Sequence, residues 1–166
     1  MKYKISKTTI GIGLFIIVSA SFSRQILALV QLRIGERGVI TLLGLVLVIS
    51  GLAFLIFAIR NKPGAKRILM LIAILTSGLY FSWQIKIPVE RIHLLEYALL
   101  GWFAARDLIK TNQKAKGAIL ACTLGIAVGI VDELFQAVLP YRVFELRDIV
   151  FNGLGTAWGI ALYFLS

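Results

Sequence analysis

The chain has 166 residues, of which 59% are hydrophobic and only 16% are charged, and its mean hydropathy is +0.90. A soluble domain has about 25% charged residues, and a chain this short could not hide so much apolar surface in one core. The composition therefore excludes an ordinary water-soluble domain and indicates a membrane protein. The formal net charge of +10 is spread between apolar stretches, which is typical of topology signals and not of a nucleic-acid-binding face.

Six apolar segments follow one another along the chain. Each one, with a few flanking residues, reaches the length of about 20 residues that a membrane-spanning helix needs. They must be helical, because backbone that faces lipid has to satisfy its own hydrogen bonds. The segments cover residues 8–23, 38–59, 68–85, 92–105, 117–131 and 149–166. The expected fold is all-α, a polytopic transmembrane bundle of about six helices, with an N-terminal helical pair and its loop at 1–67 and a four-helix domain at 68–166.

The distribution of Lys and Arg predicts the orientation, because cytoplasmic loops carry an excess of positive charge. The N-terminal tail and the loops at 60–67 and 106–116 together hold eleven Lys and Arg residues, whereas the loops on the opposite side hold seven. Both termini are therefore expected in the cytoplasm. The first apolar segment follows three lysines and ends in small residues, like a signal peptide, but we expect it to stay in the chain as an uncleaved anchor.

Polar residues that are rare in membrane helices gather at the expected extracytoplasmic ends of the last three segments. They are His93 and Glu96 in the fourth segment, Asp132, Glu133 and Gln136 at the end of the fifth, and Asp148 and Asn152 at the start of the sixth. Residues three or four apart share a helix face, so each group can point in one direction. The three groups together predict a polar pocket near the outer lipid headgroups.

Glycine spacing predicts how the last two helices pack. Gly125 and Gly129 are four residues apart, and so are Gly155 and Gly159. Small residues at this spacing let membrane helices approach closely. We therefore expect the sixth helix to pack on the fifth through these residues.

Four motifs point to a known family. They are PVERIHLLEY at 88–97, DELFQ at 132–136, PYR at 140–142 and the pattern D-x-x-x-N-x-x-G at 148–155. In this order they resemble the VanZ-like family, which is named for a teicoplanin-resistance determinant, so the domain at 68–166 is expected to be VanZ-like. By this resemblance the signature positions are His93, Tyr97, Asp132, Glu133, Gln136, Pro140, Arg142, Asp148, Asn152 and Gly155. The chain departs from the family pattern at Glu90-Arg91, at Tyr141 and at Val143-Phe144.

The first functional hypothesis is a binding protein. Its ligand would be an amphiphilic envelope molecule, such as a lipid-linked cell-wall intermediate, a phospholipid or a lipoglycopeptide, and the resemblance implies a role in the cell envelope or in glycopeptide resistance. The expected ligand-binding residues are Tyr97, Gln136, Arg142, Arg147, Asp148 and Asn152. The two arginines would hold phosphate or carboxylate groups. The expected partners are membrane lipids or a lipid-linked glycan, and not nucleic acid.

The alternative hypothesis is a membrane-embedded enzyme that modifies or hydrolyses an outer-leaflet lipid. His93, oriented by Glu96, would be the general base, and Asp132 or Glu133 would act as an acid or hold a divalent ion. No Ser or Cys lies among the motifs to serve as a nucleophile. No residue is assigned as a resident metal ligand, and the cofactor, the oligomeric state and the role of residues 24–37 are left open. A third interpretation is that these polar residues only pair with one another to hold the helices together.

Overall fold

A computed structural model describes residues 4–60, 62–85, 88–109, 113–140, 142 and 144–166. Within these residues the chain forms helices and no strand, so the predicted all-α class is confirmed. There are five helices: α1 (Lys7–Arg60), α2 (Ala65–Gln84), α3 (Pro88–Ile109), α4 (Lys114–Ala137) and α5 (Leu146–Leu165). Helices α2 to α5 correspond to the last four predicted segments. The predicted and observed ends differ by a few residues.

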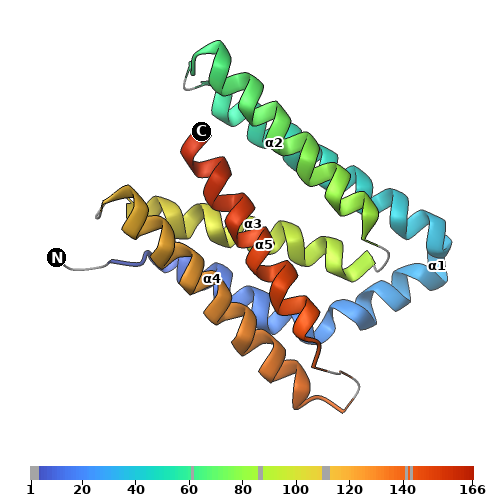
Figure 1. Cartoon of the computed structure of the whole chain (residues 1–166). Coiled ribbons are helices and arrows are strands. Elements are labelled where there is room, and N and C mark those ends of the chain that lie inside the picture. Colours follow the sequence, from blue (N-terminus) through green and yellow to red (C-terminus); the bar gives the residue numbers. More distant parts are fainter. Residues whose placement is uncertain (1–3, 61, 86–87, 110–112, 141, 143) are drawn as a thin grey trace.

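The prediction of six helices is not confirmed, because the first two segments belong to one helix of 54 residues. Residues 24–37 are rich in Leu, Arg and Gln and contain no proline, so the helix continues through them. Gly35 interrupts the helix with a φ of 72° and a ψ of 170°, a backbone conformation that glycine adopts without strain. The chain bends there into two arms, 7–34 and 36–60, which run in different directions (Figure 1).

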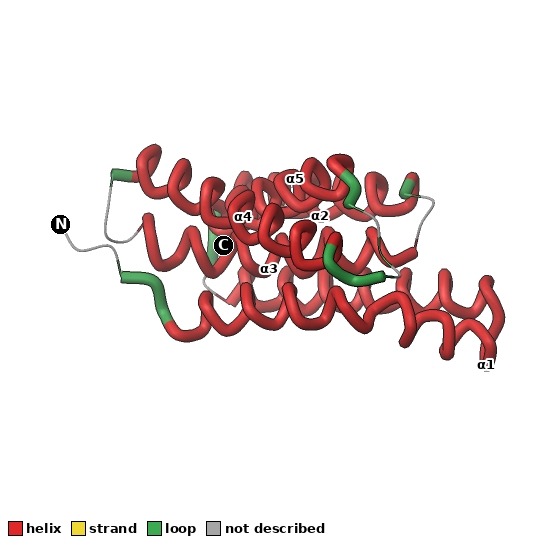
Figure 2. The backbone as a smooth tube through the Cα atoms, turned by 90° about the horizontal axis from the view of Figure 1, so that it is seen from below, coloured by secondary structure: helices red, strands yellow, loops and turns green. Residues whose placement is uncertain are grey.

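The bend of α1 extends beyond the ends of the other helices (Figure 2). Residues 31–37, which include Arg33, Glu36 and Arg37, are all exposed. Charged residues next to the bend therefore lie away from the bundle, and the loop that was expected between two helices is a helical elbow.

Four of the helices, α1, α2, α4 and α5, are long and apolar enough to cross a membrane. Helix α3 has 22 residues, but it carries charged residues near both of its ends. It lies in the middle of the bundle, against α5, α4 and the first arm of α1. Tyr97 and Leu100 of α3 are fully buried with Ile16 of α1. Neighbouring helices therefore shield much of α3 from lipid, which makes its charged residues tolerable.

The closest packing joins α3 and α5, and it depends on glycine. A Cβ atom on Gly155 would come within 2.9 Å of the carbonyl oxygen of Leu94, and one on Gly159 would overlap the carbonyl oxygen of Ala98. From the other side, a Cβ atom on Gly101 would overlap the carbonyl oxygen of Thr156. The two backbones are thus in direct contact.

This packing corrects the glycine prediction in part. The glycines of α4 do face α5, since a Cβ atom on Gly129 would come within 3.2 Å of Asn152 Cβ and one on Gly125 would overlap Thr156. Gly155 and Gly159 of α5, however, face α3 and not α4. Helix α5 packs against both helices, and it presents these two glycines to α3 and its Asn152 and Thr156 to α4.

Helix α2 lies beside the second arm of α1, and both run along one flank of the bundle (Figure 1). Trp158 of α5 reaches α2, where its indole Nε1 donates a hydrogen bond to the carbonyl oxygen of Ile74 at 3.1 Å. This contact joins α2 to the central helix α5.

Candidate functional site

The beginning of α3, the end of α4 and the beginning of α5 meet, and Asp132 is at the centre of their polar residues. The hydroxyl of Tyr97 donates a hydrogen bond to Asp132 Oδ2 at 3.2 Å, and Gln136 Nε2 donates one to Oδ1 at 3.0 Å. All three side chains are at most 1% exposed. Asp132 therefore joins α3 to α4 through a buried hydrogen-bond network.

The sequence of α4 explains this arrangement. Gly129, Asp132 and Gln136 follow one another at spacings of three and four, which place them on one face of the helix. Because Gly129 has no side chain, Asn152 and the ring of Tyr97 can lie against α4 just before Asp132. The small residue thus makes room for the polar residues of both neighbouring helices.

Glu133 has a contact that its place in the sequence does not reveal. Its Oε2 accepts a hydrogen bond from the backbone N–H of Glu145 at 3.1 Å, and the residue is 1% exposed. Glu145 immediately precedes α5. Glu133 therefore holds the beginning of α5 against the end of α4, and its predicted role as a catalytic acid stays a prediction.

His93 and Glu96 form the pair that their spacing predicts. Nδ1 of His93 lies 3.3 Å from Glu96 Oε2, although the two groups are not aligned for a hydrogen bond. The other oxygen of Glu96 accepts a hydrogen bond from the hydroxyl of Ser19 at 3.4 Å. The first arm of α1 thus completes this part of the cluster, which the last three helices were expected to form alone.

Arg142 lies between α4 and α5 and is 7% exposed, so its guanidinium is buried. Its Nε and Nη1 atoms have no hydrogen-bond partner within the described part of the chain. Burial lowers the pKa of Arg142 from its ordinary value and the charge of Arg24 lowers it further, while the carboxylates of Glu133, Asp132 and Asp148 raise it. The flanking Tyr141 and Val143, which depart from the family pattern, lie outside the described residues.

Two buried acceptors of α5 also lack a hydrogen-bond partner among the described residues. They are Oδ1 of Asn152, which is 1% exposed, and Oδ1 of Asp148, which is 8% exposed. Buried polar atoms in proteins are nearly always hydrogen-bonded, so atoms left open near one another require an explanation. Nδ1 of His93 and the Nε and Nη1 atoms of Arg142 are likewise buried without a hydrogen-bond partner among the described residues.

Arg147 faces outward. Its side chain is 52% exposed and pairs with Glu90 and, at 3.2 Å, with Oε2 of Glu145. Carboxylate oxygens of Glu90, Glu145 and Asp148 lie within 4.8 Å of one another, close enough to surround a cation. Arg147 already supplies a positive charge to all three, since its Nε also lies 4.0 Å from Asp148 Oδ1. The sequence alone assigned no functional role to Glu90 and Glu145. The signal that could have singled them out is their position, since Glu90 lies in the first turn of α3 and Glu145 immediately precedes α5.

The residues predicted for the site are therefore brought together in part. The described cluster contains His93, Glu96, Tyr97, Asp132, Gln136, Arg142, Asp148 and Asn152, with Glu133 at its edge and Arg147 outside it. Most of these side chains are buried, and the expected pocket near the outer headgroups stays a prediction. A large apolar cavity lies elsewhere, between the second arm of α1, α2, α3 and α5.

Apolar helices with exposed hydrophobic faces around buried polar residues define a polytopic helical membrane protein. The chain belongs to the VanZ-like family, because the family described as VanZ/LLP1 matches residues 7–166. The match begins well before the motifs at 88–155 and includes both arms of α1. The chain is also similar to a protein of Schizosaccharomyces pombe (strain 972), called uncharacterized protein C11E3.10. The two are 32% identical over 117 residues, which cover 68% of this chain and 69% of the yeast protein. No solved structure matches the chain.

Proposed function

We propose that this protein binds the anionic headgroup of an amphiphilic envelope molecule at the polar cluster of α3, α4 and α5. The candidate ligands are a lipid-linked cell-wall intermediate, a phospholipid and a lipoglycopeptide. The observation that carries the proposal is the buried guanidinium of Arg142, with two nitrogens that have no hydrogen-bond partner among the described residues. The link to the envelope and to glycopeptide resistance comes from the family to which the chain belongs.

The energetics favour an anion at Arg142. A buried polar group left without its hydrogen bond costs about 1–3 kcal/mol, and more when the group is charged. The guanidinium is planar and matches the paired oxygens of a phosphate or carboxylate. An anion that accepts from Nε or from Nη1 would reduce this cost and would also offset the charge of the nearby Arg24.

The remaining cluster residues divide into two roles under this proposal. Asn152 and Asp148 have open acceptors, so they would bond to hydroxyl or amide groups of the ligand. Tyr97 and Gln136 are already bonded to Asp132, so they would position that carboxylate and would not themselves grip the ligand.

For binding at this site, we expect Arg142→Gln to weaken the affinity for an isoprenoid diphosphate, used as a soluble probe of a lipid-linked headgroup, by about 10- to 100-fold. This is the range for losing a hydrogen bond to a charged group. Arg142→Lys should fall in between, because it keeps the charge but loses the planar fork. Isothermal titration of detergent-purified protein measures the affinity of both variants.

Arg24→Gln, which removes a more exposed arginine of the same region, is the matched control and should change affinity by less than about threefold. Equal affinity for the probe in wild type and Arg142→Gln would refute the role of Arg142.

The proposal also includes the topology. Arm 36–60 of α1 has 25 residues and the other arm is longer, so each can cross a bilayer core, which takes about 20 residues. With α2 to α5 this makes six crossings, cytoplasmic termini and a cluster on the extracytoplasmic side. The charge count of the loops supports this orientation.

The orientation predicts which positions a membrane-impermeant thiol reagent can label in intact cells. In a background where Cys122 is replaced by serine, we expect Phe144→Cys to be labelled before lysis, because this residue is 43% exposed in the segment between α4 and α5. Lys66→Cys, exposed at the opposite end, should be labelled only after lysis. The reverse pattern would place the polar cluster on the cytoplasmic side.

The enzyme hypothesis remains the second candidate because His93 Nδ1 lies 3.3 Å from Glu96 in a cluster that also holds Asp132. A carboxylate at Nδ1 would orient the ring and leave Nε2 to act as the general base. Incubating purified protein with extracted envelope lipids, with and without divalent ions, and analysing the lipids by mass spectrometry tests it. We expect an unchanged lipid pool. A new lipid species made by the wild type and not by His93→Gln would replace the binding proposal with an enzyme.

A further inference from the structure

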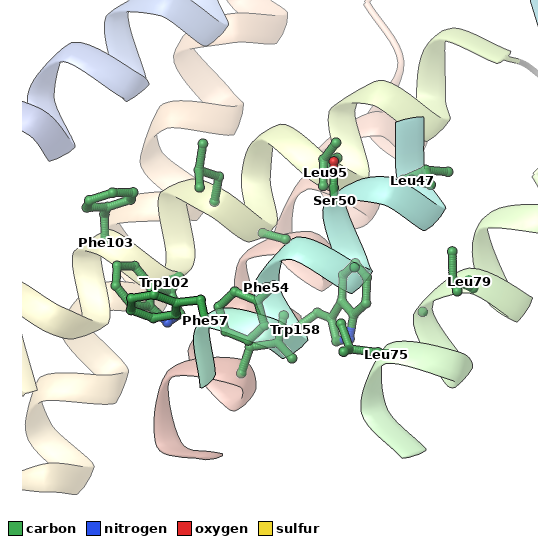
Figure 3. A pocket seen from close by; sticks show the side chains of 15 residues that line it. Leu47, Ser50, Phe54, Phe57, Leu75, Leu79, Leu95, Trp102, Phe103 and Trp158 are labelled. Carbon is green, nitrogen blue, oxygen red and sulfur yellow. The ribbon is translucent and has the colours of Figure 1, made fainter. Parts of the chain in front are cut away.

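An apolar cavity of about 410 Å³ opens between the second arm of α1, α2, α3 and α5. Figure 3 shows the aromatic rings of Phe54, Phe57 and Trp102 at one end and Leu47 and Leu79 at the other. The indole N–H groups in its wall have partners elsewhere, since Trp158 donates to Ile74 and Trp102 donates to Ser166. The wall therefore presents an almost wholly apolar surface, which suits a hydrocarbon chain.

A second cavity, of about 440 Å³, adjoins the first. The two share Phe57 and Trp102, so they meet at these rings. The second cavity is also lined by Arg106 and Lys114, and the charged residues of its described lining are both basic. The combined space thus changes from apolar in the middle of the bundle to positively charged at the end where α3 finishes and α4 begins.

The surroundings of these two basic residues determine how much charge they offer. Arg106 pairs with Asp107 at 3.1 Å and donates to the hydroxyl of Ser6, and its side chain remains 30% exposed. Asp107 in turn accepts hydrogen bonds from Ser6 and Thr9 of the N-terminal region, so its carboxylate is directed towards that region. Lys114 is exposed at the beginning of α4. The cavity mouth consequently has an excess of positive charge.

We propose that these two adjoining cavities together bind one anionic phospholipid from the leaflet on the side of the α3–α4 connection. One acyl chain lies in the apolar cavity, and the phosphate lies at Arg106 and Lys114. Basic pockets between membrane helices are a recognised type of site for anionic lipid headgroups. This site is at the opposite end of α3 from the polar cluster, so it does not rest on the proposed function.

The size of the cavity favours a lipid chain over a helix of a second copy or of another protein. A helix with its side chains is about 10 Å wide and rises about 5.4 Å per turn, so a single turn already takes about 420 Å³. The apolar cavity has about this volume in total. It could seat one turn of a helix but not a helix packed along its length, whereas a single hydrocarbon chain is thin enough to follow it.

Native mass spectrometry of the detergent-purified protein, titrated with phosphatidylglycerol or with phosphatidylcholine of the same acyl chains, tests this site. The titrations use the Arg142→Gln background, so that the polar cluster does not contribute. We expect tighter binding of phosphatidylglycerol, and a loss of about fivefold in Lys114→Ala, because one basic residue near anionic lipid contributes about that factor. Lys66→Ala removes an equal charge from the same end outside the cavity and should leave binding unchanged.

A second pair of variants tests the apolar part. Ser50→Phe should fill the cavity and reduce the binding of both lipids, whereas Val48→Phe, on an exposed face of the same helix, should not. Equal affinity for the two lipids would overturn the preference for an anionic headgroup, and binding that Ser50→Phe leaves intact would overturn the location. A dimer that Ser50→Phe dissociates, without any change in lipid binding, would assign the cavity to a second copy of the chain.

Discussion

Replacing Gly159 with alanine is expected to destabilise the protein by about 3 kcal/mol or more, the upper end of what overpacking costs. The new Cβ atom would overlap the carbonyl oxygen of Ala98 in α3. This oxygen belongs to a rigid helix backbone, so α5 can accommodate the methyl group only by moving away from α3. The thermal unfolding of detergent-purified protein, followed by size-exclusion chromatography, measures the effect.

Gly153→Ala is the matched control in the same helix. Its Cβ atom would meet only Ile126 Cγ1, at an ordinary contact distance of 3.8 Å. Alanine is also the better helix former, so we expect this variant to stay within about 1 kcal/mol of the wild type. Equal unfolding temperatures for Gly159→Ala and Gly153→Ala would show that α3 and α5 are not in backbone contact.

Replacing Asp132 with alanine is expected to cost a large part of the stability as well as the function. The change leaves the hydroxyl of Tyr97 and the amide of Gln136 without their shared acceptor in a site that is at most 1% exposed. Each unsatisfied buried donor costs about 1–3 kcal/mol. We expect Asp132→Ala to accumulate poorly in membranes, which quantitative immunoblotting of the membrane fraction measures.

Asp132→Asn separates the structural from the functional contribution. Asparagine keeps the shape and one acceptor for Tyr97, and Gln136 can rotate its amide to accept from the new NH₂ group. We therefore expect this variant to accumulate in membranes, unlike Asp132→Ala. Glu133→Gln, which retains an acceptor for the Glu145 N–H, should also accumulate. If Asp132→Asn is absent from membranes, the polar cluster serves to hold the helices together and the proposed binding site loses its support.

Much of the fold follows from the sequence, because the backbone of an apolar chain in lipid has to satisfy its own hydrogen bonds and therefore forms helices. The segments that became α2, α4 and α5 were recognised from their uncharged runs. Helix α3 was recognised in spite of His93 and Glu96, because its apolar residues continue on both sides of them. The error lay at residues 24–37, where charged residues suggested a loop. A charge disfavours a position in the lipid core, but it does not stop the backbone from staying helical, and α1 continues through these residues with a bend at Gly35.

The sequence predicted which residues form the polar cluster, but it did not predict most of the contacts between them. Helical spacing assigned Asp132 and Gln136 to one face and paired His93 with Glu96, and the structure shows both pairs. Family resemblance singled out Arg142, whose sequence position alone suggests only a loop residue. These conclusions were possible because residues three or four apart on a helix are neighbours whatever surrounds them.

Only the tertiary structure decided which neighbour each face meets. Gly155 and Gly159 of α5 could equally have faced α4, and they meet α3 because of the way in which α5 packs against both helices. Glu133 bonds to the N–H of Glu145, Arg147 turns outward to Glu90, and Arg142 stays buried with open nitrogens. None of these is a local property, since each depends on the order and depth at which separate helices pack. Sequence periodicity determines the direction of a side chain relative to its own helix axis, and the packing of the helices determines what lies in that direction.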